Sequence, residues 1–200
     1  MVQPKSSKKL ILDLSRRAAF ELVSVFVAIL LALWVNDLYS DHQRNQKIQL
    51  AMASVKSELA KNYASLVKAH EHQQTSIEIM NGYMSKGEEF TEEQAKALYS
   101  QLFQRSMYRP ADLLDTAWQV LIQSQLLNYM PYDLVLEYSH LYNKQIQLTK
   151  SQDAYSQYAM ELAYSDISYV QYMHGFYSHM KELWWREKNL IKAFKNAKVN

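Results

Sequence analysis

The amino-acid sequence predicts an all-α protein, and three observations point to that class. The chain of 200 residues contains only 3 Gly and 3 Pro, far below the usual share of either residue. A fold built on strands needs many turns, and turns depend on Gly, Pro, Asn and Asp at defined positions. Long stretches instead show apolar side chains at spacings of three and four, which is the period of a helix.

The composition also excludes several classes of function. The chain has no Cys, which excludes disulfides, thiolate zinc sites and Cys nucleophiles. Three glycines leave no room for a Gly-rich phosphate-binding loop. The net charge of +2 is weak and argues against nucleic acid as a partner.

The first 36 residues predict an anchor in the lipid bilayer. A basic tail, residues 1–17, ends in Arg16 and Arg17. The apolar stretch that follows predicts a transmembrane helix over residues 18–36. Its apolar run, residues 18–35, would span about 27 Å as a helix, close to the roughly 30 Å of a hydrocarbon core. We expect Arg16 and Arg17 at the inner membrane interface and Trp34 at the outer one.

The cations around this stretch predict its orientation. Five Lys or Arg side chains precede the span, whereas only Arg44 and Lys47 occur in the fifteen residues after Asn36. The positive-inside rule then places the N-terminus in the cytoplasm. We expect a single-pass protein of a bacterial inner membrane with residues 37–200 in the periplasm. A cleaved signal peptide and a soluble core helix are the alternatives, but the stretch lacks a small-residue cleavage site.

Small and polar side chains recur along one face of the span and predict a transmembrane packing face: Glu21, Ser24, Ala28, Ala32 and Asn36. Small residues at this spacing let helices approach closely in lipid, and an acid within a span often marks a functional contact. The alternative is that Ala and Ser are simply common in such helices.

The outer part begins with a long helix over residues 37–85, which contains no Pro and a single Gly. Gly87 predicts its end. A second helix is predicted to run to about residue 106. It starts at Thr91 as N-cap, with Gln94 closing a capping box.

Pro110 marks the next break in the helical pattern. Apolar spacing predicts a third helix over residues 111–124. Residues 125–130 read as a corner, and Pro131 suits the first turn of a new helix.

Two more helices complete the prediction, over residues 131–164 and 166–197. Together with the first, they predict an antiparallel helical bundle that continues from the transmembrane helix. Near-heptad spacing leaves a coiled coil between chains as an alternative. Polar residues on or near the helix seams favour a register-specified interface: Asn62, Gln73, Gln145 and Gln152.

Two blocks of the sequence resemble a known family. One is the span from Glu21 through residues 27–37. The other covers residues 115–124 and is followed by Leu127, Met130-Pro131-Tyr132 and residues 142–145. Both are similar to an uncharacterised family of bacterial single-pass inner-membrane proteins with a helical extracytoplasmic domain. Gln125 stands where members often have Gly. The resemblance implies topology and fold and transfers no catalytic residue.

The titratable residues do not form a recognisable catalytic or metal site. His70 and His72 are two residues apart and lie on roughly opposite sides of a helix. Glu137 and His140 have the E-x-x-H spacing of di-iron bundles, but those proteins need a second such motif, which the sequence lacks. We therefore predict no catalytic residue, no cofactor and no metal, and we expect that the protein is not an enzyme.

Aromatic residues predict two contact surfaces. Of 15 Tyr, we interpret four as a candidate partner surface, because Tyr is enriched at interfaces: Tyr138, Tyr142, Tyr155 and Tyr158. Core packing is the alternative for them. Trp184 and Trp185 belong to a basic C-terminal segment that could lie on anionic headgroups; the alternative is a last helix of the bundle.

These observations predict a non-catalytic, membrane-anchored accessory, scaffolding or regulatory protein. It would act through helix–helix contacts with itself, as a homo-oligomer, or with another inner-membrane protein. The alternative is a periplasmic sensor bundle that binds a small ligand or a metal. A deep polar pocket around Glu137 and His140 would favour this alternative, and a fully packed core there would oppose it.

Overall fold

A computed structural model of the chain describes residues 7–84 and 90–197, and the side chains of 7–18 and 162–163 are not described. The described residues form helices and connecting segments without a strand, which confirms the all-α prediction. The elements are α1 (Ser7–Met84), α2 (Glu92–Gln104), α3 (Thr116–Gln123), the 3-10 helix η1 (Leu126–Tyr129), α4 (Tyr132–Ala163) and α5 (Tyr169–Asn196). The chain divides into two units, Met1–Gln49 and Leu50–Asn200, whose boundary lies within α1.

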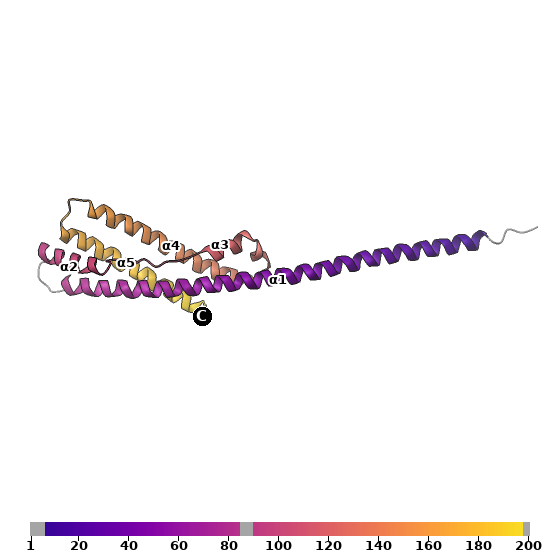
Figure 1. Ribbon diagram of the computed structural model, residues 1–200, viewed down its shortest axis with the longest axis horizontal. Coiled ribbons are helices and arrows are strands. Elements are labelled where there is room, and N and C mark those ends of the chain that lie inside the picture. The colour runs from indigo at the N-terminus through magenta and orange to yellow at the C-terminus, as the bar shows by residue number, and fades with distance from the viewer. Residues whose placement is uncertain (1–6, 85–89, 198–200) are drawn as a thin grey trace, which may run out of the picture. The chain divides into compact units, whose positions relative to one another are not determined.

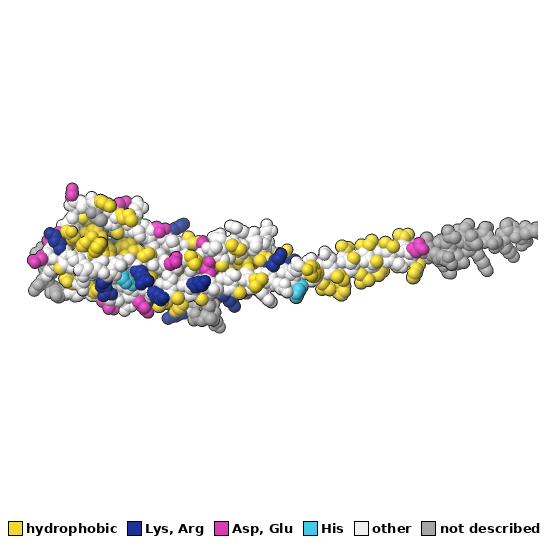
Figure 2. Space-filling model, viewed as in Figure 1, with side chains coloured by type: hydrophobic (Ala, Val, Ile, Leu, Met, Phe, Trp, Pro, Cys, Tyr) yellow, Lys and Arg dark blue, Asp and Glu magenta, His cyan; other side chains and the backbone are white. Residues whose placement is uncertain are grey.

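The described part of the first unit is the N-terminal part of α1. Every described side chain of residues 19–41 is exposed, and Figure 2 shows the apolar ones in yellow next to the grey residues. An 18-residue window of α1 near the N-terminus has a mean hydropathy of 2.2, so this helix is long and apolar enough to cross a membrane. The hydroxyl of Ser24 donates to the carbonyl of Phe20 at 2.8 Å, so its hydrogen-bond donor is paired within the helix.

The second unit is a bundle built on residues 50–84 of α1. In Figure 1, α4 and α5 lie along this part of α1, with α2 near the end at which α4 turns into α5. Side-chain contacts fix the directions. Along α4, Tyr142 contacts Glu58 and Gln145 contacts Asn62, so α4 runs parallel to α1. Along α5, Tyr177 donates to Asn81 and Phe194 packs on Tyr63. Thus α5 runs antiparallel to α1 and to α4, as the predicted antiparallel bundle requires.

Local capping explains how α2 and α5 begin. Thr91 is the N-cap of α2 and forms the predicted capping box with Gln94. The carboxylate of Glu92 accepts hydrogen bonds from the backbone N–H groups of Tyr169 (2.9 Å) and Val170 (3.3 Å). An acid of α2 therefore satisfies donors at the start of α5. Gly87, the predicted end of the first helix, lies outside the described residues.

The predicted helix over residues 111–124 is wrong in its first part, because α3 begins only at Thr116. Residues 106–115, here called the connecting leg, are non-helical and run along α1 between α2 and α3 (Figure 1). Side chains of α1 bind the backbone that a helix would otherwise use. Asn62 accepts from the N–H of Leu114 at 2.9 Å and donates to its carbonyl at 2.6 Å.

The corner and α4 follow the prediction closely. Gln125 has a φ of 59°, in the left-handed region, and the short helix η1 follows it. The carbonyl of Pro131 accepts from the N–H groups of Leu134 and Val135, so Pro131 opens the first turn of α4. The predicted last helix starts three residues later than expected, at Tyr169, where Ser168 is its N-cap.

Candidate functional site

The polar seam residues predicted from the sequence are all buried. The amide of Gln73 donates to the carbonyl of Arg109 at 3.0 Å. The amide of Gln152, oriented to satisfy both backbone groups, accepts from the N–H of Ala111 and donates to its carbonyl. Because unpaired backbone groups are costly when buried, these amides hold the connecting leg in place and are structural.

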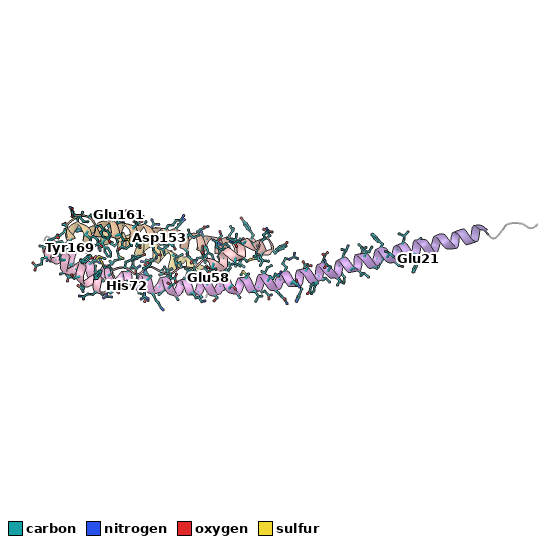
Figure 3. The ribbon with its side chains drawn as sticks, turned by 45° about the horizontal axis from the view of Figure 1, so that its top comes forward. Glu21, Glu58, His72, Asp153, Glu161 and Tyr169 are labelled. Atoms are coloured by element: carbon teal, nitrogen blue, oxygen red, sulfur yellow. The ribbon has the colours of Figure 1, made fainter. Side chains whose placement is uncertain are left out.

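A second buried group surrounds Glu58, which is labelled on α1 in Figure 3. One carboxylate oxygen accepts from the N–H of Ala117 at 2.8 Å, and the other accepts from the hydroxyl of Tyr142 at 2.7 Å. The N-cap of α3, Asp115, makes no side-chain capping bond. Glu58, a residue of α1, caps α3 in its place by accepting from the N–H of Ala117. Burial raises the pKa of Tyr142, and the hydrogen bond to Glu58 adds to this effect.

A third buried group contains the only pairing of a histidine with a carboxylate among the described residues. Glu187 is 0% exposed and accepts from the amide of Gln73 at 2.8 Å. Nδ1 of His70 lies 3.4 Å from its other oxygen, and His70 stacks on Trp184. Burial raises the pKa of Glu187, although His70 and Gln73 oppose the shift. No Ser, Thr or Lys contact completes a catalytic arrangement there, and the described residues hold no cluster of three metal-ligating side chains.

The predicted tyrosine surface is wrong for three of its four members. Tyr138, Tyr142 and Tyr155 are 3%, 1% and 3% exposed, so they belong to the core of this chain. Tyr142 stacks on Trp118, and Tyr155 packs edge-on against Tyr108. Tyr158 is half-buried and stacks on His179 with ring centroids 4.2 Å apart. Aromatic packing, the alternative interpretation, accounts for these contacts.

The residues predicted to act in the membrane differ in how far their side chains are exposed. The transmembrane packing face is exposed throughout, and Glu21 is labelled on it in Figure 3. Trp34 and Trp185 are exposed as well, whereas Trp184 is half-buried. The side chains of Arg16 and Arg17 lie outside those described. The membrane contacts of all these residues stay predictions.

The basic C-terminal segment is the last helix of the bundle, which was the alternative to a helix lying on anionic headgroups. Apolar side chains of α5 are buried, among them Leu190 and Phe194. Lys188 lies over the ring of Trp184, 5.0 Å from its centroid. Lys195 stands in the last turn, where a cation complements the helix dipole.

A groove of about 650 Å³ lies between the N-terminal half of α4 and the C-terminal half of α5. Both members of the E-x-x-H pair, Glu137 and His140, line it. A polar pocket around these two residues is the feature that would favour the ligand-binding alternative. The remaining lining residues are Leu141, Lys144, Gln147, Leu148, Trp185, Arg186, Asn189, Leu190, Lys192, Ala193, Asn196 and Ala197. Residues that lie about fifty positions apart in the sequence, on α4 and on α5, thus line one groove.

A further surface was not among the predictions, although the sequence shows it. No charged residue occurs between Asp115 and Asp133. We call residues 116–132 the uncharged corner; it comprises α3, η1 and the start of α4. Four of its large apolar side chains are exposed: Val120, Ile122, Tyr129 and Tyr132.

The geometry offers two surfaces for binding, the uncharged corner and the groove, and no catalytic arrangement among the described residues. Comparison with protein-family models, with curated proteins and with solved structures finds no match for this chain. The resemblance of the two sequence blocks, within residues 21–37 and 115–145, to a membrane-protein family therefore stays a prediction.

Proposed function

We propose that this chain is a non-catalytic accessory or scaffolding protein anchored in a bacterial inner membrane. The N-terminus lies in the cytoplasm and the bundle in the periplasm. The protein acts through contacts with a second copy of itself or with another membrane protein. The observation that carries the proposal is the uncharged corner, and the exposed apolar stretch of α1 supports the anchor.

The uncharged corner has the composition of a protein interface. Val120 and Tyr132 are 58% and 73% exposed, and large apolar side chains on a surface favour association because water is released from them. Charged residues are depleted and Tyr is enriched at the centres of interfaces. A run of seventeen residues without a charge is not expected on a surface that faces only water.

The test is the association state of the full chain in a neutral detergent and its cross-linking in native membranes. Val120→Glu and Tyr132→Glu each place one negative charge in the corner. Ala154→Glu places the same charge on an exposed part of α4 and is the matched control. We expect the two corner variants to weaken association at least about tenfold, whereas the control leaves it unchanged.

Three results would contradict the proposal. A strictly monomeric chain that forms no cross-link in its own membrane has no partner to scaffold. Equal loss of association in Ala154→Glu would show that net charge, and not the corner, controls the contact. Unchanged association in both corner variants would place the contact elsewhere, for example on the packing face that contains Ser24 and Ala28.

Orientation is tested separately. A phosphatase that is active only outside the cytoplasm, fused after Asn200, should be active. A reporter active only in the cytoplasm should be silent at the same position. The reverse pattern would overturn the proposed topology but would leave the corner and its contacts unaffected.

A further inference from the structure

We propose that the groove between α4 and α5 binds a small organic anion, which consists of a flat ring carrying a phosphate or carboxylate group. This goes beyond the scaffolding function, because the groove and the uncharged corner share no residue. It gives the ligand-binding alternative a site and a class of ligand. The argument rests on the shape of the groove, on its charges and on one exposed indole.

The shape of the groove suits a small molecule. Its volume of about 650 Å³ falls within the range of small-molecule sites, roughly 300–1,000 Å³. Leu141, Leu148 and Leu190 line it, but they are at most 2% exposed. A partner helix would need apolar side chains to contact, and these leucines offer almost no surface to it. Trp185 and the two alanines, Ala193 and Ala197, add apolar surface to the charged and amide groups of the lining, and this combination suits a small ligand that carries both an apolar ring and a polar group.

The charges of the groove favour an anion. Three cations line it, Lys144, Arg186 and Lys192, against one acid, Glu137. Arg186 is already paired with Glu182 at 2.7 Å. Among the described residues, no carboxylate lies within ion-pair distance of Lys144 or Lys192, which come from opposite walls. A bound anion can accept charge-assisted hydrogen bonds from these ammonium groups.

The wall near Arg186 adds a place for a ring. Trp185 is 59% exposed and lines the groove together with the amides of Gln147 and Asn189. A flat ring gains area by stacking on an indole, and the amides can donate to oxygen atoms of the ligand. A molecule that joins a ring to an anionic group can use Trp185 and the two lysines at once.

The experiment measures binding of phenyl phosphate, benzoate and inorganic phosphate to the full chain in a neutral detergent. These probes separate the phosphate head, the carboxylate head and the contribution of the ring. The variants are Lys144→Ala/Lys192→Ala and Trp185→Ala. The matched control is Lys150→Ala/Lys195→Ala, which removes two exposed cations from the same two helices outside the groove.

We expect at least one ring-bearing anion to bind more tightly than inorganic phosphate. The double lysine variant should lower its affinity at least about tenfold, the scale of losing a charge-assisted hydrogen bond. The Trp185 variant should weaken the ring-bearing probes and spare inorganic phosphate. The control variant should bind as the wild type does.

The proposal is overturned if none of the three probes binds, or if the control variant loses as much affinity as the groove variant. Saturation by an acidic amphipathic peptide with no binding of the small anions would assign the groove to a protein partner instead. Because the corner variants leave the groove intact, failure here and failure of the scaffolding function can be told apart.

Discussion

Asn62 makes the sharpest test of how the bundle is held together. Its side-chain amide donates to the carbonyl of Leu114 and to Oε1 of Gln145, both at 2.6 Å, and its oxygen accepts from the N–H of Leu114 at 2.9 Å. Asn62→Ala removes all three bonds. At about 0.5–1.5 kcal/mol each, the expected loss is about 3 kcal/mol of unfolding free energy.

Two further substitutions at this position separate the causes. Asn62→Leu fills the site with apolar volume, but the N–H and carbonyl of Leu114 and the Oε1 atom of Gln145 still lose their partner. We expect it to be as destabilising as Asn62→Ala. Asn62→Asp keeps the acceptor but turns a second carboxylate oxygen toward the oxygens of Leu114 and Gln145. At neutral pH we expect it to be the least stable variant, and acidification should reduce its deficit as the carboxylate takes up a proton.

The assay is thermal unfolding of the full chain in a neutral detergent, followed by circular dichroism. For a chain of this size, 1 kcal/mol corresponds to about 2–4 °C, so a loss of about 3 kcal/mol should lower the midpoint by about 6–12 °C. Asn143→Ala, on the exposed face of α4, is the control and should stay within about 0.5 kcal/mol of the wild type. If Asn62→Ala also stays within that margin, or if Asn62→Leu exceeds the wild type in stability, the reasoning is refuted.

Three other predictions concern single contacts. Because burial raises the pKa of Glu187 above its ordinary value of 4.5, its ionisation destabilises the fold. The wild type should therefore lose stability relative to Glu187→Gln as the pH rises through the folded pKa, with a constant difference below the unfolded pKa; parallel pH profiles of the unfolding midpoint would contradict this. A Cβ at Gly175 would lie 2.6 Å from the hydroxyl of Tyr158, so Gly175→Ala should gain about 1 kcal/mol of helix propensity only in a Tyr158→Phe background. Additive effects in that double-mutant cycle would exclude the clash. Thr91→Ala should lose about 1 kcal/mol through the capping box, measured by denaturant unfolding, and Thr75→Ala, whose hydroxyl bonds only within α1, is a comparison that should cost less.

The elements that the sequence predicts well depend on local signals. The capping box at Thr91 and the start of α4 after Pro131 are decided by residues within one turn of the helix. The long helices carry many repeats of the apolar pattern, so a few polar interruptions do not hide it. The uncharged corner was not predicted, but it could have been, since the absence of charge between Asp115 and Asp133 can be seen without knowledge of the fold.

The features that the sequence did not predict depend on contacts between distant residues. Leu113 and Leu114 fit a helical pattern, but Asn62, 52 positions away, binds the backbone and keeps it non-helical. Tyrosine is both apolar and polar, so its pattern alone does not separate a core seam from a contact surface. Lys144 and Lys192 face one groove only because α5 runs back along α4.

One stripe of polar residues on α1 explains why the buried seam was predicted correctly and why residues 111–115 were wrongly predicted to be helical. Glu58, Asn62 and Gln73 lie on it at helical spacing and are buried, although their polarity would ordinarily place them in water. An up-and-down four-helix bundle has four long helices, whereas here α2 and the connecting leg together return along α1 in the place of one of them. A non-helical segment lacks the internal backbone hydrogen bonds of a helix, and here polar side chains of α1 supply partners for its buried backbone groups. The polar stripe is therefore what allows a non-helical chain inside a helical bundle, and with apolar residues in its place the same segment would have to become helical or leave the core.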